Sequence, residues 1–227
     1  EYFHHYNVKR IRPLELGPFD YDQGSRTNLL WVSEGLSVYY EYLIVKRAGL
    51  VDLSTLLSHF DGNLNAHENN PGRFHQSLTQ ASYNTWKDGP FGTQGDEPGK
   101  AISYYDKGPL VGLLLDLEIR QATKNAKSLD DVMREIYWMY YKQAGRGFTD
   151  AEFQQACETV AGVPLTKVFE FVYTTKELDY DGILGYAGLK IERQPAADDK
   201  SKPKMKIARI QNPDALQQAI LKSLARD

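Results

Sequence analysis

The chain has 227 residues, of which 25% are charged and 41% hydrophobic, with a formal net charge of −3. This composition is ordinary for a globular protein of one or two domains, and the charge balance excludes the basic surface typical of nucleic-acid-binding proteins. The longest apolar stretch, residues 110–115, is far shorter than the roughly 20 residues that a membrane-spanning helix needs. The single cysteine, Cys157, excludes an intrachain disulfide and a cysteine zinc cluster.

Amphipathic segments follow one another through the first half of the chain and predict helices. Residues 1–5 have a helical pattern without a cap, so we expect the chain to begin inside a helix. A long helix is predicted over residues 28–47, with Gly49 as its C-terminal stop. Asp52 has the position of an N-cap, and the break at residues 69–72 follows the helix that it opens. Two more helices are predicted over residues 76–87 and 105–123. Residues 88–100 between them are rich in glycine and proline and predict a loop that is suited to border a site.

The second half of the chain continues this pattern and ends with two short strands and a last helix. Ser128 and Thr149 each precede an acidic residue by three positions, which is the spacing of a capping box, and they predict helices to residues 143 and 161. Pro164 suits the first turn of a helix to residue 174. The remaining predictions are a break in the helical pattern over residues 182–188, strands over 187–193 and 204–210, and a helix over 213–224.

Three segments contain residues that suit catalysis or metal binding. Glu1 and His4 would lie one turn apart on one face of a helix, a pattern that alone is more typical of a solvated pair. Glu34 lies within the apolar part of a helix, where a carboxylate needs a metal or a partner, and a salt bridge to an arginine is the alternative. At the start of a later helix, Tyr104 or Tyr105 can offer a hydroxyl to a developing oxyanion.

Together these three segments resemble the glycyl aminopeptidase family of zinc metallopeptidases, which belongs to the gluzincin group. The active-site helix of that family has the pattern His-Glu-x-x-His followed by Asn-Val-Lys-Arg-Ile-Arg-Pro, and residues 1–13 match it from the glutamate onward. Residues 31–35 match the Trp-x-Ser-Glu-Gly segment of the family, and residues 105–108 match its Tyr-x-Lys-Gly segment. The resemblance extends from residue 1 to about Glu192 and, more loosely, to the last helix.

The resemblance implies a mainly α fold, namely the helical lobe of a thermolysin-like domain with a few short β-strands near the C-terminus. It implies that His4 and Glu34 are ligands of a zinc ion, and that Glu1 is the general base toward a water on that ion. It also implies that Tyr105 stabilises the oxyanion formed from a peptide carbonyl. The implied substrates are peptides with a small amino-terminal residue, glycine or alanine. A further implied partner is an N-terminal lobe of the same protein.

Two features depart from the family pattern. The histidine that should immediately precede Glu1 is not in the chain, so we expect this chain alone to bind zinc weakly or not at all and to be inactive. Residues 193–204 have the composition of a linker and stand where many members have a PDZ domain. We therefore divide the chain into residues 1–192, the helical part of the catalytic domain, then this linker, and residues 205–227, a C-terminal strand and helix.

Two alternative functions stay open at this point. One is a helical protein-interaction domain without catalysis, which a residue other than histidine before Glu1 would favour. The other is a zinc endopeptidase, because the groups that would bind a free substrate amine are not identifiable in the chain. The sequence does not determine the compartment or the oligomeric state, and only the resemblance suggests a bacterial origin.

Overall fold

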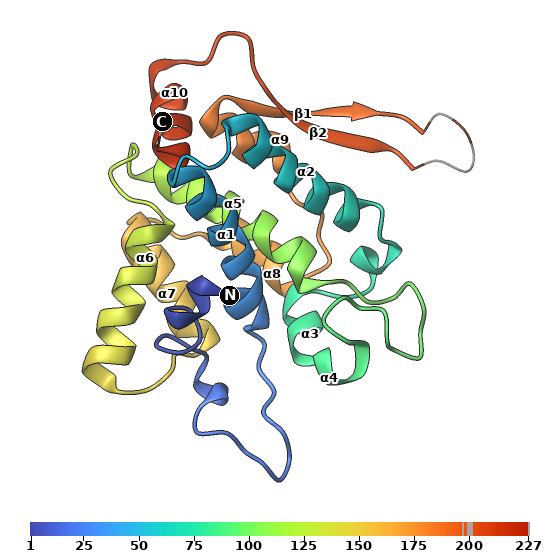
Figure 1. Cartoon of the computed structure of the whole chain (residues 1–227), viewed down its shortest axis with the longest axis vertical. Coiled ribbons are helices and arrows are strands. Elements are labelled where there is room, and N and C mark those ends of the chain that lie inside the picture. The colour runs from blue at the N-terminus through green and yellow to red at the C-terminus, as the bar shows by residue number, and fades with distance from the viewer. Residues whose placement is uncertain (197, 199–201, 227) are drawn as a thin grey trace.

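A long buried helix, α5 (Tyr104–Ala122), runs through the centre of the structure, and the other helices pack around it (Figure 1). This computed structural model describes residues 1–196, 198 and 202–226. Helix α5 confirms the helix predicted over residues 105–123 to within one residue at each end. Its apolar stretch is buried on all sides, and its charged residues Asp116 and Arg120 are buried as an ion pair with 3.0 Å between Arg120 Nε and Asp116 Oδ2. A helix that is covered on every side forms the core of a small helical protein.

The helix predicted over residues 28–47 begins later than expected and has two parts. Residues Trp31–Gly35 form a π-helical turn, η3, and Leu36–Arg47 form the α-helix α1. The helix ends at Arg47, and the predicted stop, Gly49, follows two residues later with a φ of +72° that glycine adopts without strain. Both parts lie against α5.

Capping residues set the ends of the next helices. Asp52 accepts a hydrogen bond from the backbone N–H of Thr55 and opens α2 (Leu53–Glu68), as predicted. The single helix predicted over residues 76–87 is wrong, because the chain forms two short helices, α3 (Leu78–Tyr83) and α4 (Thr85–Asp88). They are separated at Asn84, a residue type with low helix propensity, whose backbone has φ −87° and ψ 9°.

The capping boxes at Ser128 and Thr149 are both present. They open α6 (Leu129–Ile136), which continues as the π-helical η5 (Tyr137–Ala144), and α7 (Asp150–Ala161). The helix predicted from Pro164 to residue 174 is α8 (Thr166–Tyr173), and Pro164 lies just before its N-cap, Leu165, instead of in its first turn. The predicted break over residues 182–188 is wrong, because α9 (Tyr180–Leu184) and the 3₁₀ turn η6 (Gly185–Ala187) occupy most of it. Asp179 caps α9 by accepting from the Gly182 N–H, and the buried side chains of Ile183 and Leu184 hold it in the core.

The two predicted strands are confirmed and form an antiparallel hairpin. Strand β1 (Leu189–Gln194) pairs with β2 (Lys204–Arg209), with Ile191 opposite Ile207. The hairpin lies alongside α2, and the C-terminal helix α10 (Ala215–Ala225) returns to pack on η6 and α1 (Figure 1). Both ends of the predicted linker 193–204 belong to the two strands, and its residues 197 and 199–201 lie outside the described residues.

Over the described residues the fold is mainly α, with two short strands, as predicted. Across residues 1–196, 198 and 202–226, no helix combines the length and the apolar character that crossing a membrane would need. The N-terminal turn, the start of α1 and the start of α5 meet on one face of the molecule, which brings the predicted site residues together.

Candidate active site

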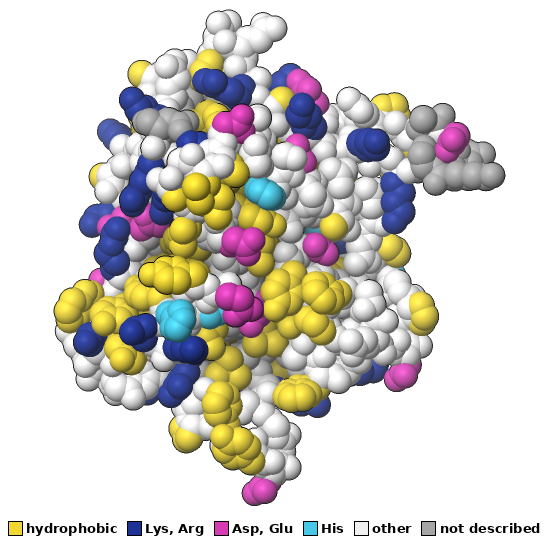
Figure 2. All heavy atoms as spheres, viewed as in Figure 1, with side chains coloured by type: hydrophobic (Ala, Val, Ile, Leu, Met, Phe, Trp, Pro, Cys, Tyr) yellow, Lys and Arg dark blue, Asp and Glu magenta, His cyan; other side chains and the backbone are white. Residues whose placement is uncertain are grey.

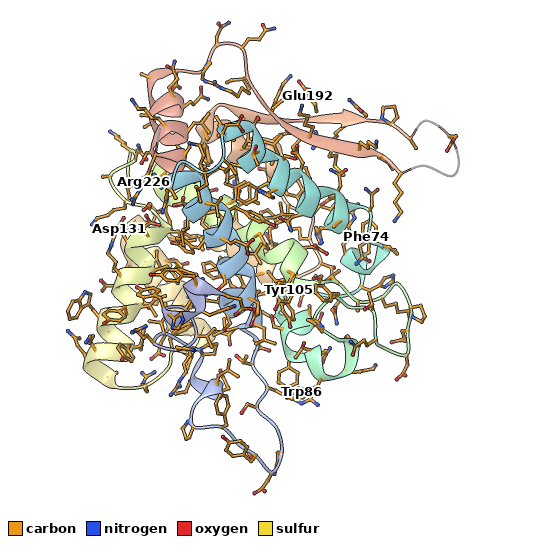
Figure 3. The ribbon with its side chains drawn as sticks, viewed as in Figure 1. Phe74, Trp86, Tyr105, Asp131, Glu192 and Arg226 are labelled. Atoms are coloured by element: carbon orange, nitrogen blue, oxygen red, sulfur yellow. The ribbon has the colours of Figure 1, made fainter. Side chains whose placement is uncertain are left out.

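A cavity of about 360 Å³ opens where these three segments meet. The four residues of the predicted site, Glu1, His4, Glu34 and Tyr105, all line it. Figure 2 shows histidine and acidic side chains among hydrophobic ones in the middle of this face. In Figure 3, Tyr105 lies near the centre of the view. Residues far apart in the sequence therefore converge on one solvent-accessible space.

Glu34 lies between His4 and Tyr105. Its Oε2 atom is 3.3 Å from His4 Nε2, and the hydroxyl of Tyr105 donates a hydrogen bond of 2.8 Å to the same oxygen. The side chains of His4 and Glu34 are 24% and 26% exposed, so both can be reached from the cavity. The sequence predicted that the Glu34 carboxylate needs a metal or a partner, with an arginine as the alternative. In the structure its partners are a histidine and a tyrosine.

The orientation of His4 is set by its second ring nitrogen. His4 Nδ1 is 3.1 Å from the backbone oxygen of Asn7 and 3.4 Å from the hydroxyl of Ser37. Because a carbonyl oxygen only accepts, Nδ1 is the nitrogen that donates to Asn7, and Nε2 is the ring nitrogen that faces Glu34. A histidine that ligates a metal through one nitrogen commonly donates through the other in this way.

Asn7 also ties the N-terminal turn to η3. Its side-chain nitrogen donates to the backbone oxygens of Val32 and Ser33 at 2.8 and 3.1 Å, and to the Ser37 hydroxyl at 3.0 Å. Asn7 is only 1% exposed, so these bonds satisfy a buried amide. The sequence analysis missed Asn7 and Ser37, because an asparagine or a serine near a histidine has no distinctive local pattern.

The π-helical turn η3 contains Glu34 and is held against α5 by two glycines. A Cβ atom on Gly35 would lie 2.7 Å from the Cα of Gly108 and 2.9 Å from the carbonyl oxygen of Tyr104. The absence of side chains at Gly35 and Gly108 therefore lets the two helices approach closely enough for Tyr105 to reach Glu34. An isolated glycine within an apolar helical pattern is the sequence signal that could have found this contact.

Of the two tyrosines considered from the sequence, the structure places Tyr105 at the cavity. The hydroxyl of Tyr104 is 3.0 Å from the hydroxyl of Thr85, and Tyr104 is buried. Burial raises the pKa of Tyr105 above its ordinary value, and the hydrogen bond to Glu34 and the charge of Glu34 raise it further. The Tyr105 phenol therefore keeps its proton at neutral pH and can donate it in a hydrogen bond.

Glu1 lies at the exposed rim of the cavity. The predicted helix at the start of the chain is wrong in its extent, because only Tyr2–His5 form a single 3₁₀ turn, η1, and Glu1 precedes it. The His4 N–H donates to the Glu1 carbonyl oxygen at 3.1 Å. Residues three apart lie above one another in a 3₁₀ turn, so Glu1 and His4 still share one side of it.

The donor set at the cavity fits two ligands of a zinc ion. An imidazole nitrogen and a carboxylate oxygen are both ordinary zinc ligands, and here His4 and Glu34 face the same space. The hydrogen bond from His4 Nδ1 to a backbone carbonyl is the expected support for such a ligand. Among the residues that the structure describes, no group of three or more His, Cys, Asp and Glu side chains is placed to hold a metal.

Comparisons with known proteins agree with the motifs of the site. Residues 1–111 match the model of a family described as M61 glycyl aminopeptidase. The crystal structure of an aminopeptidase N family protein from Idiomarina loihiensis is similar over 88% of this chain, with a TM-score of 0.79 and 26% sequence identity. The chain covers 34% of that protein, about a third of its length. A search of curated proteins finds no match.

The matched stretch contains η1, η3, α1 and the start of α5, which are the segments that build the cavity. Glu1, His4, Glu34 and Tyr105 all fall within it. Residues 1–111, and with them the four residues of the candidate active site, are therefore similar to the M61 glycyl aminopeptidase family.

Proposed function

We propose that this chain is part of a zinc-dependent aminopeptidase that cleaves peptides with a small amino-terminal residue, glycine or alanine. The observation that carries the proposal is the convergence of His4, Glu34 and Tyr105 on one cavity. The match of residues 1–111 to the glycyl aminopeptidase family model and the likeness to an aminopeptidase N family protein support a peptidase, and the family description is the reason for proposing this substrate class.

In this proposal the side chains of His4 and Glu34 would hold the metal. Zinc would supply Lewis-acid chemistry, namely a water of lowered pKa and a polarised substrate carbonyl. Tyr105 keeps its proton and donates a hydrogen bond to the substrate oxygen as negative charge develops there. Glu1, at the rim of the cavity, accepts a proton from the attacking water and returns it to the leaving amine. Asn7 and Ser37 keep the His4 ring oriented.

The proposal includes two partners. One is the peptide substrate, and the other is the remainder of a longer protein, because the chain covers 34% of the related crystal structure. The family pattern expects a third ligand, a histidine immediately before Glu1. We propose that this histidine and an N-terminal lobe complete the site.

The test is the zinc content and peptidase activity of two proteins, each purified with and without the substitution Glu34→Gln. One protein is this chain, and the other is a longer protein in which a histidine precedes Glu1. We expect about one zinc per molecule in the longer protein, and loss of both zinc and hydrolysis of glycyl and alanyl peptides in its Glu34→Gln variant. Glu192→Gln, which removes an exposed carboxylate of the hairpin, is the matched control and should retain both.

Circular dichroism should confirm that every variant is folded. A folded longer protein that binds no zinc would contradict the metallopeptidase proposal and favour a helical protein-interaction domain. Equal cleavage of peptides with blocked and free amino termini would instead indicate an endopeptidase.

A further inference from the structure

The cavity at the candidate site extends beyond His4 and Glu34, along the side of α1. This extension is lined by Tyr2 of the N-terminal turn and by Val38, Glu41, Ile44 and Val45 of α1. Four of these five side chains are apolar or aromatic, and the fifth is a carboxylate. No lysine or arginine is found among the described residues that line the cavity. The extension therefore combines hydrophobic walls with a negative charge that no basic residue of the lining neutralises.

Glu41 is free to bind a group that enters from solvent. Its side chain is exposed, and the hydrogen bonds and ion pairs within residues 1–196, 198 and 202–226 do not include it. Glu34 differs in this respect, because its carboxylate already contacts His4 and Tyr105. Of Glu34 and Glu41, which line the cavity together with Glu1, only Glu41 has a carboxylate without a partner among the described residues.

The spacing along α1 limits what Glu41 can recognise. Glu41 follows Glu34 by seven residues, which is two helical turns and about 10 Å along the axis. In a peptide, the amino nitrogen lies only about 2.5 Å from the carbonyl carbon of its own residue. If the carbonyl to be cleaved lies beside Glu34 and Tyr105, the α-amine of that residue is too close to this carbonyl to reach Glu41.

A long basic side chain fits the extension better. The aliphatic part of lysine or arginine spans several ångströms and packs along apolar surface, while its charged end remains at a polar or charged group. Val38, Ile44, Val45 and Tyr2 offer that apolar surface, and Glu41 offers the carboxylate. An ammonium or guanidinium group forms a charge-assisted hydrogen bond with a carboxylate.

We propose that this extension is a subsite for a lysine or arginine side chain of the peptide substrate, and that Glu41 determines its preference for a positive charge. The proposal rests on the proposed function, because it takes the cavity at His4 and Glu34 as the place of the scissile bond. A peptide is favoured as the occupant because the extension is continuous with that cavity.

The experiment measures peptide binding by the metal-free chain, so that it depends on neither zinc nor turnover. Alanine tetrapeptides with one lysine at each position in turn are titrated against the same peptides with norleucine in place of lysine. Binding is followed by NMR shifts of the α1 amides in the wild-type chain, in Glu41→Gln and in the control Glu192→Gln. For at least one position we expect the lysine peptide to bind about three- to tenfold more tightly than the norleucine peptide.

In Glu41→Gln this preference should disappear while the affinity for norleucine peptides stays unchanged, and Glu192→Gln should behave as wild type. A lysine preference that persists in Glu41→Gln would overturn the proposal, as would equal binding of the two peptide series. Absence of shifts in α1 with every peptide at millimolar concentration would also overturn it and indicate that another segment of a longer protein covers the extension. The two tests fail independently. If the longer protein binds zinc but the peptide titration shows no lysine preference, only the subsite is rejected. If the titration shows a lysine preference but the longer protein binds no zinc, only the metallopeptidase is rejected.

Discussion

Asn7 is almost fully buried, and its side-chain amide joins the N-terminal turn to η3 through two backbone carbonyls and one hydroxyl. Its own backbone oxygen lies beside His4 Nδ1. One residue without a catalytic group therefore fixes both the position of the turn and the orientation of the histidine. Buried amides act in this way because an unpaired polar group in the interior costs free energy.

Replacing Asn7 tests this role. We expect Asn7→Ala to lower the free energy of unfolding by about 1–3 kcal/mol, because the carbonyls of Val32 and Ser33 lose a buried donor. Urea unfolding measures the loss, and ¹⁵N NMR of the imidazole reports whether His4 keeps its proton on Nδ1. Asn212→Ala, at an exposed position, should change neither. Unchanged stability in Asn7→Ala would contradict the assigned role.

A second prediction at this scale concerns His67, which is 5% exposed at the end of α2. Burial, and then the positive charges of Lys107 and Arg73, lower the pKa of His67 from 6.5 to about 3. Between these two values the unfolded chain binds a proton at this residue and the folded chain does not. The free energy of unfolding should therefore fall as the pH is lowered from about 6.5 toward 3, by up to about 1.4 kcal/mol per pH unit from His67.

Urea unfolding of the wild type and of His67→Gln between pH 7 and pH 4 checks this prediction. Carboxylates contribute equally to both proteins, so the difference between the two pH profiles isolates His67. The variant should lose less stability on acidification than the wild type. Parallel profiles would mean that the pKa of His67 is not lowered in the folded protein.

Among the elements, the contact between η3 and α5 determines whether Glu34 and Tyr105 meet. Gly35 and Gly108 allow this contact, and the π-helical turn carries Glu34 at the same place. In contrast, the starts of α2, α6 and α7 are set by residues next to them in the sequence, because Asp52, Ser128 and Thr149 cap these helices as predicted. The errors at Asn84 and at residues 180–187 arose where weak local preferences were decided by packing.

Glycine substitutions test the contact. Gly35→Ala should lower the free energy of unfolding by about 1–3 kcal/mol, because its Cβ would meet backbone atoms of Gly108 and Tyr104 that cannot turn away. It should also weaken any function that needs Tyr105 beside Glu34. Gly62→Ala is the matched control within α2, where no atom lies within 4 Å of the new Cβ, and it should raise stability by about 0.5–1 kcal/mol. Urea unfolding measures the free energy of unfolding of both variants, and an equal change in the two would argue against a tight contact at Gly35.

For the molecule as a whole, α2 joins the hairpin to the helical body. Asp61 Oδ1 accepts from the N–H of Ile207, and Asn65 both accepts from and donates to the backbone of Met205. These residues are four apart on α2, so they face the same strand. The edge of β2 is thereby satisfied by side chains of a helix, which keeps it from pairing with another strand.

The last prediction concerns this attachment. Asn65→Ala removes both hydrogen bonds to Met205 and should make the Met205 amide exchange faster with solvent than the amides of α5. We expect the global free energy of unfolding to fall by about 1–3 kcal/mol. Hydrogen exchange followed by NMR measures the local effect, and Lys206→Ala, at an exposed position of the same strand, is the control. If Met205 stays protected in Asn65→Ala, the hairpin is held by its apolar contacts instead.

The sequence by itself determined the helical class, most helix ends, the two strands and the candidate residues of the site. Such features depend on signals within a few residues of each other, namely apolar spacing, caps and short motifs. Only the tertiary structure decided that Tyr105, 71 residues from Glu34, donates to its carboxylate, and that Asn7 orients His4. It also decided the glycine contact and the extension at Glu41, because these join segments whose distance no local pattern encodes.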